Sequence, residues 1–142
     1  MRRLVVLGLL LLMAACASAP PATTPAAPTA PAFPATKALV HVYRRAIPLG
    51  PATLSIYDGA ALVGSLASGT YFDYQADPGP RSLKAVGAGA GSIPHATTFR
   101  AGQEYWFMVY FLGDQDTGNA TITQVDAATA QAILATLKPA AP

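Results

Sequence analysis

Residues that could carry acid–base or nucleophilic chemistry are few in this chain of 142 residues. It holds two histidines, His41 and His95, one cysteine and seven carboxylates. A zinc site needs three or four ligands at defined spacing, and the sequence has no His-x-His or His-x₃-His pair. No G-x-S-x-G turn surrounds Ser55, Ser65 or Ser82. A Ser–His–Asp set could still assemble in space, because its order along the chain is not fixed. The residues nevertheless favour a protein with no catalytic site, metal or cofactor.

Two loops have compositions that bind ions in other proteins. Asp114 and Asp116 are two residues apart, like carboxylates in Ca²⁺-binding loops, but Val125 stands where such a loop needs a bidentate Glu. Residues 87–92 are rich in Gly but lack the Gly-Lys-Ser/Thr ending of a phosphate-binding loop. We therefore expect a polar hairpin loop and a flexible loop at these places.

Aromatic side chains are the candidates for recognition. Tyr57 and Tyr71 lie in predicted strands and would suit stacking on sugar rings. Trp106 and Tyr110 share one face of the strongest predicted strand and would suit contact with a partner protein. For all four the alternative is burial in the core.

The basic residues do not indicate a nucleic-acid partner. The formal net charge is +2, and Arg2 and Arg3 near the N-terminus supply two of the nine basic residues. The remaining seven are balanced by seven acidic residues, which is not the composition of a nucleic-acid-binding domain. Arg44 and Arg45 at the end of a predicted strand would meet a phosphate or a carboxylate, or would keep that strand end soluble.

The first residues predict a secretory signal. Arg2 and Arg3 precede ten apolar residues at 4–13. This run is too short to span a bilayer, which takes a helix of about 20 apolar residues. The only cysteine, Cys16, ends the sequence Leu-Met-Ala-Ala-Cys, which resembles the lipobox of bacterial lipoproteins. A plain signal peptide or a twin-arginine signal is the alternative.

The lipobox resemblance implies a mature protein that begins at Cys16, with a thioether-linked diacylglycerol on the thiol and a fatty acid such as palmitate on the amino group. Residues 1–15 would then be the signal peptide. Ala17 rather than Asp follows the cysteine, which favours anchoring in the outer membrane with the domain facing the periplasm. The predicted partners are therefore the membrane, through acylated Cys16, and an envelope protein or peptidoglycan.

A tether is predicted between this anchor and the folded domain. Residues 17–36 contain eight Ala, six Pro and four Thr, a composition that favours an extended chain over a packed core. At about 3.1 Å per residue it would reach up to about 60 Å. The domain is expected at residues 37–139 and a tail at 140–142.

The domain is predicted to be mainly β. Short apolar runs alternate with turn residues, and Asp58-Gly59 between two runs predicts a hairpin. The expected strands are residues 38–44, 54–57, 61–66, 70–74, 82–86, 95–100, 104–112 and 119–125. This spacing predicts a small antiparallel β-sandwich or open barrel of about seven or eight strands.

The strand at 104–112 is apolar on both faces and should be covered on both. Asp126 would cap a short C-terminal helix, which Pro139 would stop. Its apolar stripe consists of Ala130, Ile133, Leu134 and Leu137. We expect this helix to cover one face of the strand; the alternative is that the Trp106 face meets a partner.

The domain resembles an uncharacterised family of small bacterial lipoproteins with a PEGA-like surface β-sandwich. The resemblance lies in a series of short motifs that ends with Val-Asp-Ala-Ala-Thr-Ala. The series is Leu-Val-His-Val-Tyr-Arg, Ile-Tyr-Asp-Gly, Gly-Thr-Tyr-Phe, Pro-Gly-Pro-Arg-Ser-Leu and Ala-Gly-Gln-Glu-Tyr-Trp-Phe. The resemblance covers about residues 37–138. It implies a lipid-anchored envelope domain with no established enzymatic activity and no catalytic residues.

The expected function is a non-catalytic, lipid-anchored module of the cell envelope that acts through protein contacts. Binding of peptidoglycan or another glycan is the alternative, and hydrolysis is a third. No feature of the sequence separates the first two.

Overall fold

The computed structural model describes residues 33–114 and 118–141 of the chain. Ten strands and one helix form this part of it. In chain order they are β1 (Ala38–Arg44), β2 (Thr53–Asp58), β3 (Ala61–Ala67), β4 (Thr70–Ala76), β5 (Gly79–Val86), β6 (Gly91–Ile93), β7 (His95–Phe99), β8 (Glu104–Leu112), β9 (Asn119–Val125), α1 (Ala127–Leu134) and β10 (Lys138–Pro139). The predicted class is confirmed: a mainly β domain with one C-terminal helix.

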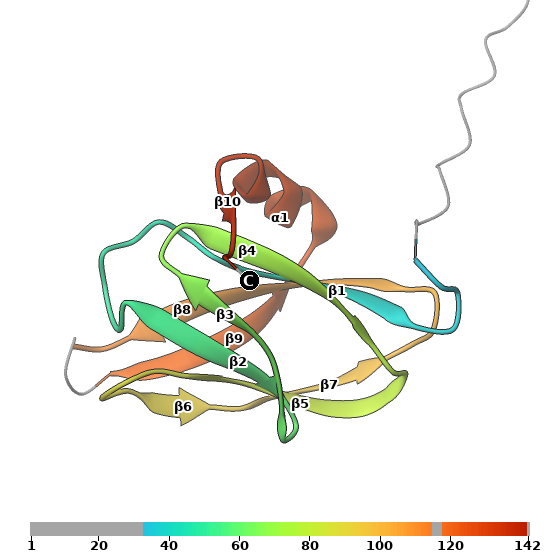
Figure 1. The fold of residues 1–142 in the computed structure, drawn as a ribbon, viewed down its shortest axis with the longest axis horizontal. Coiled ribbons are helices and arrows are strands. Elements are labelled where there is room, and N and C mark those ends of the chain that lie inside the picture. The colour runs from blue at the N-terminus through green and yellow to red at the C-terminus, as the bar shows by residue number, and fades with distance from the viewer. Residues whose placement is uncertain (1–32, 115–117, 142) are drawn as a thin grey trace, which may run out of the picture. The chain divides into compact units, whose positions relative to one another are not determined.

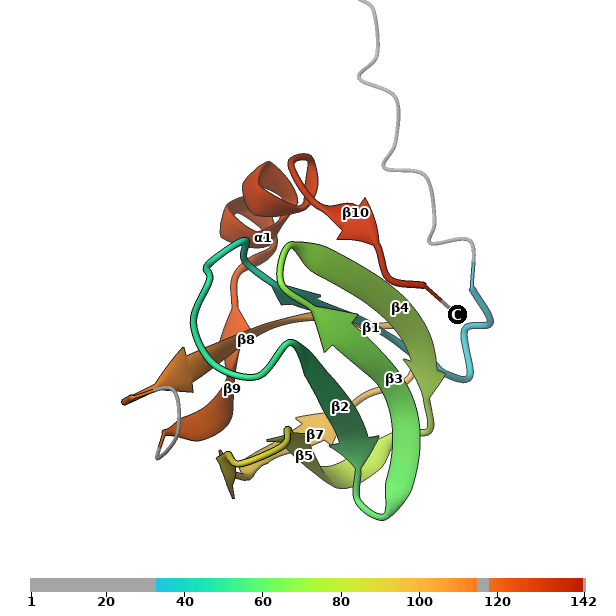
Figure 2. The same ribbon diagram turned by 60° about the vertical axis from the view of Figure 1, so that its left-hand side comes forward.

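Two sheets pack face to face, with α1 on the outer side of the larger sheet (Figures 1 and 2). The larger sheet has the order β10-β4-β1-β8-β9-β6 and the smaller has β3-β2-β5-β7. The architecture is thus a sandwich. The larger sheet is mixed rather than purely antiparallel, because β1 and β8, β6 and β9, and β10 and β4 pair in parallel. Between β1 and β8 the chain passes through the smaller sheet, and such a long crossover permits parallel pairing.

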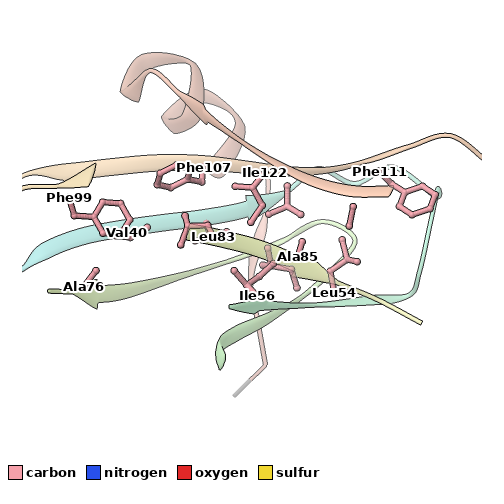
Figure 3. Packing of buried hydrophobic residues seen from close by; sticks show 14 of the residues in the cluster. Val40, Leu54, Ile56, Ala76, Leu83, Ala85, Phe99, Phe107, Phe111 and Ile122 are labelled. Carbon is pink, nitrogen blue, oxygen red and sulfur yellow. The ribbon is translucent and has the colours of Figure 1, made fainter. Parts of the chain in front are cut away.

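The core fills the space between the sheets. Fully buried apolar side chains alternate along the inner faces, as a half-covered strand requires. The larger sheet contributes Val40, Val42, Phe107, Val109 and Ile122, and the smaller contributes Leu54, Ile56, Leu66, Leu83 and Phe99. Figure 3 shows Val40, Phe107 and Ile122 facing Leu83, Ala85 and Ile56 across this space.

The helix α1 covers the outer face of β8, as the apolar stripe predicts. Tyr43, Trp106 and Ala130 are the buried centre of this second cluster, which we call the α1 cluster. Tyr71, Met108, Val125, Ile133, Leu134 and Leu137 pack around it. The helix ends at Leu134 rather than at Pro139. Residues 135–137 turn the chain, with the Thr136 N–H donating to the Ile133 carbonyl at 2.9 Å, and the chain then pairs with β4, where the Lys138 N–H donates to the Gly69 carbonyl at 3.1 Å.

Asp126 caps α1 as predicted. Its carboxylate accepts the Thr129 backbone N–H at 2.8 Å and the Thr129 hydroxyl at 2.7 Å. These hydrogen bonds, the side-chain one above all, lower the pKa of Asp126 from its ordinary 3.8. Because the folded pKa is the lower one, the stabilisation is present above pH 3.8 and is lost as the pH falls through the folded pKa.

We expect Asp126→Ala to lower the urea midpoint of unfolding near neutral pH, because Ala cannot accept the Thr129 N–H. Asp126→Asn keeps an acceptor that does not titrate. The urea midpoint of Asp126→Asn should therefore stay close to that of the wild type near neutral pH. When the pH falls below 3.8, this variant should lose less stability than the wild type. If the wild type and Asp126→Asn lost the same amount of stability at acid pH, this role of the carboxylate would be contradicted.

Several loops match their predictions and others do not. The Asp58-Gly59 hairpin joins β2 to β3, and Gly59 has a φ of +62°. Residues 87–92, expected to be a flexible loop, run into β6 at Gly91. The described residues form ten strands where seven or eight were expected, because β6 and β10 are too short to show an apolar pattern. The expected tail is anchored, since the Ala140 N–H donates to the Tyr71 carbonyl at 2.7 Å.

None of the helices in the described part of the chain is long and apolar enough to cross a bilayer.

Candidate functional site

A groove lies beside the end of β8, between that strand and the loop of residues 45–52 that leads from β1 to β2. Its volume is about 250 Å³. We call it the β8 groove; it is lined by Arg44, Arg45, Ile47, Leu49, Met108, Val109, Tyr110 and Phe111. Large apolar side chains stand exposed at its edge: Ile47 is 45% exposed and Leu49 is 39% exposed. Leu112, next to the groove in β8, is 47% exposed.

Arg44 holds the loop that forms one wall of the groove. Its side chain is buried, and its guanidinium donates to the Pro51 and Leu49 carbonyls at 2.8 Å each. Burial lowers the pKa of Arg44 from its ordinary value. Charge-assisted hydrogen bonds of this kind are roughly twice as strong as neutral ones, so the loop has a defined position.

Gly50 lets the same loop approach β8 closely. Its φ is +81°, which non-glycine residues rarely adopt. A Cβ at this position would lie 2.6 Å from the ring of Phe111. Only glycine therefore fits between the loop and β8.

Of the four aromatic residues predicted to contact a partner, Tyr110 lines the groove. Trp106 does not: it is 9% exposed, with the His41 ring stacked on it at 3.7 Å, and it belongs to the α1 cluster. Tyr71 packs against that cluster too. Tyr57 lies in the smaller sheet, with the Lys84 ammonium 5.2 Å from its ring centre. The structure therefore makes Trp106 a packing residue rather than a surface contact.

Sequence reasoning missed Ile47 and Leu49. They lie in a segment with Pro48, Gly50 and Pro51, residues that predict only an interruption between two strands. Turn segments are usually built from Gly, Pro, Asn, Asp and Ser. Two large apolar residues in this segment were therefore the one sequence feature that could have indicated an exposed apolar surface.

A second cluster forms around His41 on the outer face of the larger sheet. Strand register aligns Asp73, His41 and Trp106 in one row across β4, β1 and β8. His41 Nδ1 lies 2.7 Å from Asp73 Oδ1, and His41 Nε2 lies 3.8 Å from Glu104 Oε2. In a Ser–His–Asp set the second nitrogen faces the hydroxyl nucleophile, whereas here it faces a carboxylate. His95, the other histidine, lies in the smaller sheet with its ring 5.6 Å from that of Phe107.

A third group of polar side chains consists of the buried Asp58 and the half-buried Tyr74 and Arg81. Burial raises the pKa of Asp58, and Arg81, whose Nε lies 3.9 Å from Asp58 Oδ2, opposes the shift. Burial and then the Asp58 charge raise the pKa of Tyr74. Within residues 33–114 and 118–141, no cluster of three or more His, Cys, Asp or Glu residues could hold a metal ion.

Several predicted features lie outside the described residues. These are the signal peptide, Cys16, most of the tether, and residues 115–117 of the loop whose carboxylates resemble a Ca²⁺ site.

Comparisons with protein-family models, with curated proteins and with solved structures found no match to this chain.

Proposed function

We propose that this protein is a non-catalytic binding module of the bacterial cell envelope that acts through protein contacts at the β8 groove. The observation that carries the proposal is the pair of exposed apolar side chains, Ile47 and Leu49, that line the groove together with the exposed Arg45. Leu112, which is also exposed, follows the lining residues along β8. Apolar side chains gathered at one surface and rimmed by polar residues are typical of interaction sites.

The anchor in this proposal is acylated Cys16, attached through the tether. The described chain begins at Phe33 and enters the domain at the start of β1 (Figure 1). The β8 groove lies at the end of β1, since Arg44 lines it. Seven residues of strand separate these places, which corresponds to about 20 Å at about 3.3 Å per residue. The groove thus lies at the opposite end of β1 from the end that follows Phe33.

The alternative, binding of peptidoglycan or another glycan, would use the predicted tyrosines. Tyr57 lies in the smaller sheet and Tyr71 in the larger one. Two rings on different sheets do not form one stacking surface for a sugar chain. The geometry therefore favours a protein partner over a glycan.

Photo-crosslinking in living bacteria tests the proposal. A photoreactive amino acid replaces Leu49 at the groove, and in a matched control it replaces Leu62, which is exposed in β3 and does not line the groove. We expect position 49, and not position 62, to give a discrete protein adduct that is unchanged by muramidase. Equal adducts from both positions, no protein adduct from position 49, or an adduct that muramidase removes would contradict the proposal.

A further inference from the structure

Two hollows in the surface adjoin at Arg45 and Ile47, which line both of them. One is the β8 groove, of about 250 Å³. The other has a volume of about 290 Å³ and lies between the loop after β1 and the C-terminal part of α1. We call it the α1 hollow. Because they share two residues, the two hollows form one continuous surface.

The walls of both hollows are mainly apolar. Leu49 and Tyr110 line the β8 groove, and Ile133 and Leu137 line the α1 hollow. Ile47, which belongs to both, is 45% exposed. Pockets that hold small-molecule ligands measure about 300–1,000 Å³, and each hollow is smaller than that. One or two apolar side chains of another protein would fill each of them.

Arg45 is the charged residue that the two hollows share. It is exposed, and it forms no ion pair with a carboxylate among the described residues. Arg44 differs, because its guanidinium is occupied by the Pro51 and Leu49 carbonyls. Guanidinium groups match carboxylates in geometry. A carboxylate placed where the two hollows meet would therefore pair with Arg45.

The same charge disfavours a membrane as the occupant of this surface. Segments that bind anionic lipids carry clusters of about four to eight Lys or Arg residues. Of the residues that line either hollow in the described part of the chain, Arg45 is the only exposed basic one. One cation between two apolar hollows instead fits the mixed side chains of a protein segment.

From these observations we infer that the two hollows together bind one segment of a partner protein, in which an acidic residue stands between two apolar residues. The acidic residue pairs with Arg45. One apolar side chain enters the β8 groove and the other enters the α1 hollow, with Ile47 packed between them. This inference rests on the proposed function and names the chemistry of the partner at the same site.

The test uses a random peptide library displayed on phage and selected on the full-length chain purified in detergent. The best-enriched peptide is synthesised, and each of its side chains is replaced in turn by that of alanine. We expect an acidic residue between two apolar residues to carry the binding. Loss of either apolar side chain should weaken binding roughly tenfold, and loss of the acidic one about two- to fivefold, the range for an exposed ion pair.

The α1 hollow is tested by filling it. Ala132 is exposed on α1 and lines this hollow, so Ala132→Leu should weaken binding roughly tenfold by occupying the space of one apolar side chain. Ala128→Leu is the matched control, since Ala128 is exposed on the same helix and lines neither hollow. On Ala132→Leu, replacing one apolar residue of the peptide should have no further effect, while replacing the other should keep its full effect.

The charge is tested in the same assay. Arg45→Gln should weaken binding about two- to fivefold, and Lys84→Gln, in the smaller sheet, should leave it unchanged. Changing the acidic residue of the peptide to its amide should have the same effect on the wild type and no further effect on Arg45→Gln.

The inference would be overturned if no peptide were enriched, if the enriched peptide lacked an acidic residue between apolar ones, or if Ala132→Leu or Arg45→Gln bound it like the wild type. Displacement of the peptide by phosphatidylglycerol in the same micelles, and not by phosphatidylcholine, would assign the surface to an anionic lipid instead. A groove-specific protein adduct at position 49 would leave the proposed function standing even where the inference fails. Loss of that adduct would remove the proposed function itself.

Discussion

Replacing Cys16 by serine is expected to abolish acylation of the protein and to move it from the detergent phase to the aqueous phase in a phase-separation assay. The predicted diacylglycerol is attached to the thiol, and serine has none. Each buried CH₂ of an acyl chain contributes about 0.8 kcal/mol to membrane affinity, and stable anchoring needs more than one chain. The measurement is incorporation of an alkyne-tagged fatty acid together with the phase distribution.

Ser18→Ala is the matched control, since Ser18 lies two residues from Cys16 in the same segment and carries no predicted lipid. It should be labelled and distributed like the wild type. Equal labelling of wild type and Cys16→Ser, or no labelling of either, would contradict lipidation at Cys16. In that case the plain signal peptide would become the better interpretation of residues 1–16.

The second large effect is expected from Phe107→Ala, which should lower the free energy of unfolding by about 3–5 kcal/mol. Phe107 is fully buried between the sheets, and its ring lies 6.1 Å from that of Phe99 and 5.6 Å from that of His95. Truncation removes contacts with both sheets and leaves a cavity. Folded domains are stable by only about 5–15 kcal/mol, so this variant would lose a large share of its stability.

Urea unfolding of the full-length chain measures this change, with an expected fall in the midpoint of about 2 M. Leu62→Ala is the control, because Leu62 is exposed on the edge strand β3, and its change should stay within about 0.5 kcal/mol. Similar midpoints for Phe107→Ala and the wild type would mean that the two sheets do not pack as the structure describes.

The elements that sequence reasoning predicted well are those with a local pattern. A continuous run of apolar and aromatic residues predicted β8, Asp58-Gly59 predicted the hairpin between β2 and β3, and Asp126 with the apolar stripe after it predicted α1. Each of these signs lies within a dozen residues of chain, so no knowledge of distant contacts was needed.

The features that were missed depend on residues far apart in the chain. Parallel pairing of β1 with β8 joins segments more than sixty residues apart, and the row of Asp73, His41 and Trp106 exists only because of that pairing. The β8 groove likewise depends on β1 ending three residues short of β8. No local pattern reports the relative lengths of two strands that meet only in the folded protein.

Trp106 and Tyr110 show which properties the local sequence predicts and which depend on the tertiary structure. Alternation alone placed both on the same face of one strand, and that placement is a property of the extended backbone, whose side chains repeat every two residues. Which of the two is covered was decided by the tertiary structure: the α1 cluster includes Trp106 and Met108, while Tyr110 lines the open groove beyond it. The reason is physical, because side-chain direction follows from local backbone geometry, whereas burial follows from how far a distant helix reaches along the strand.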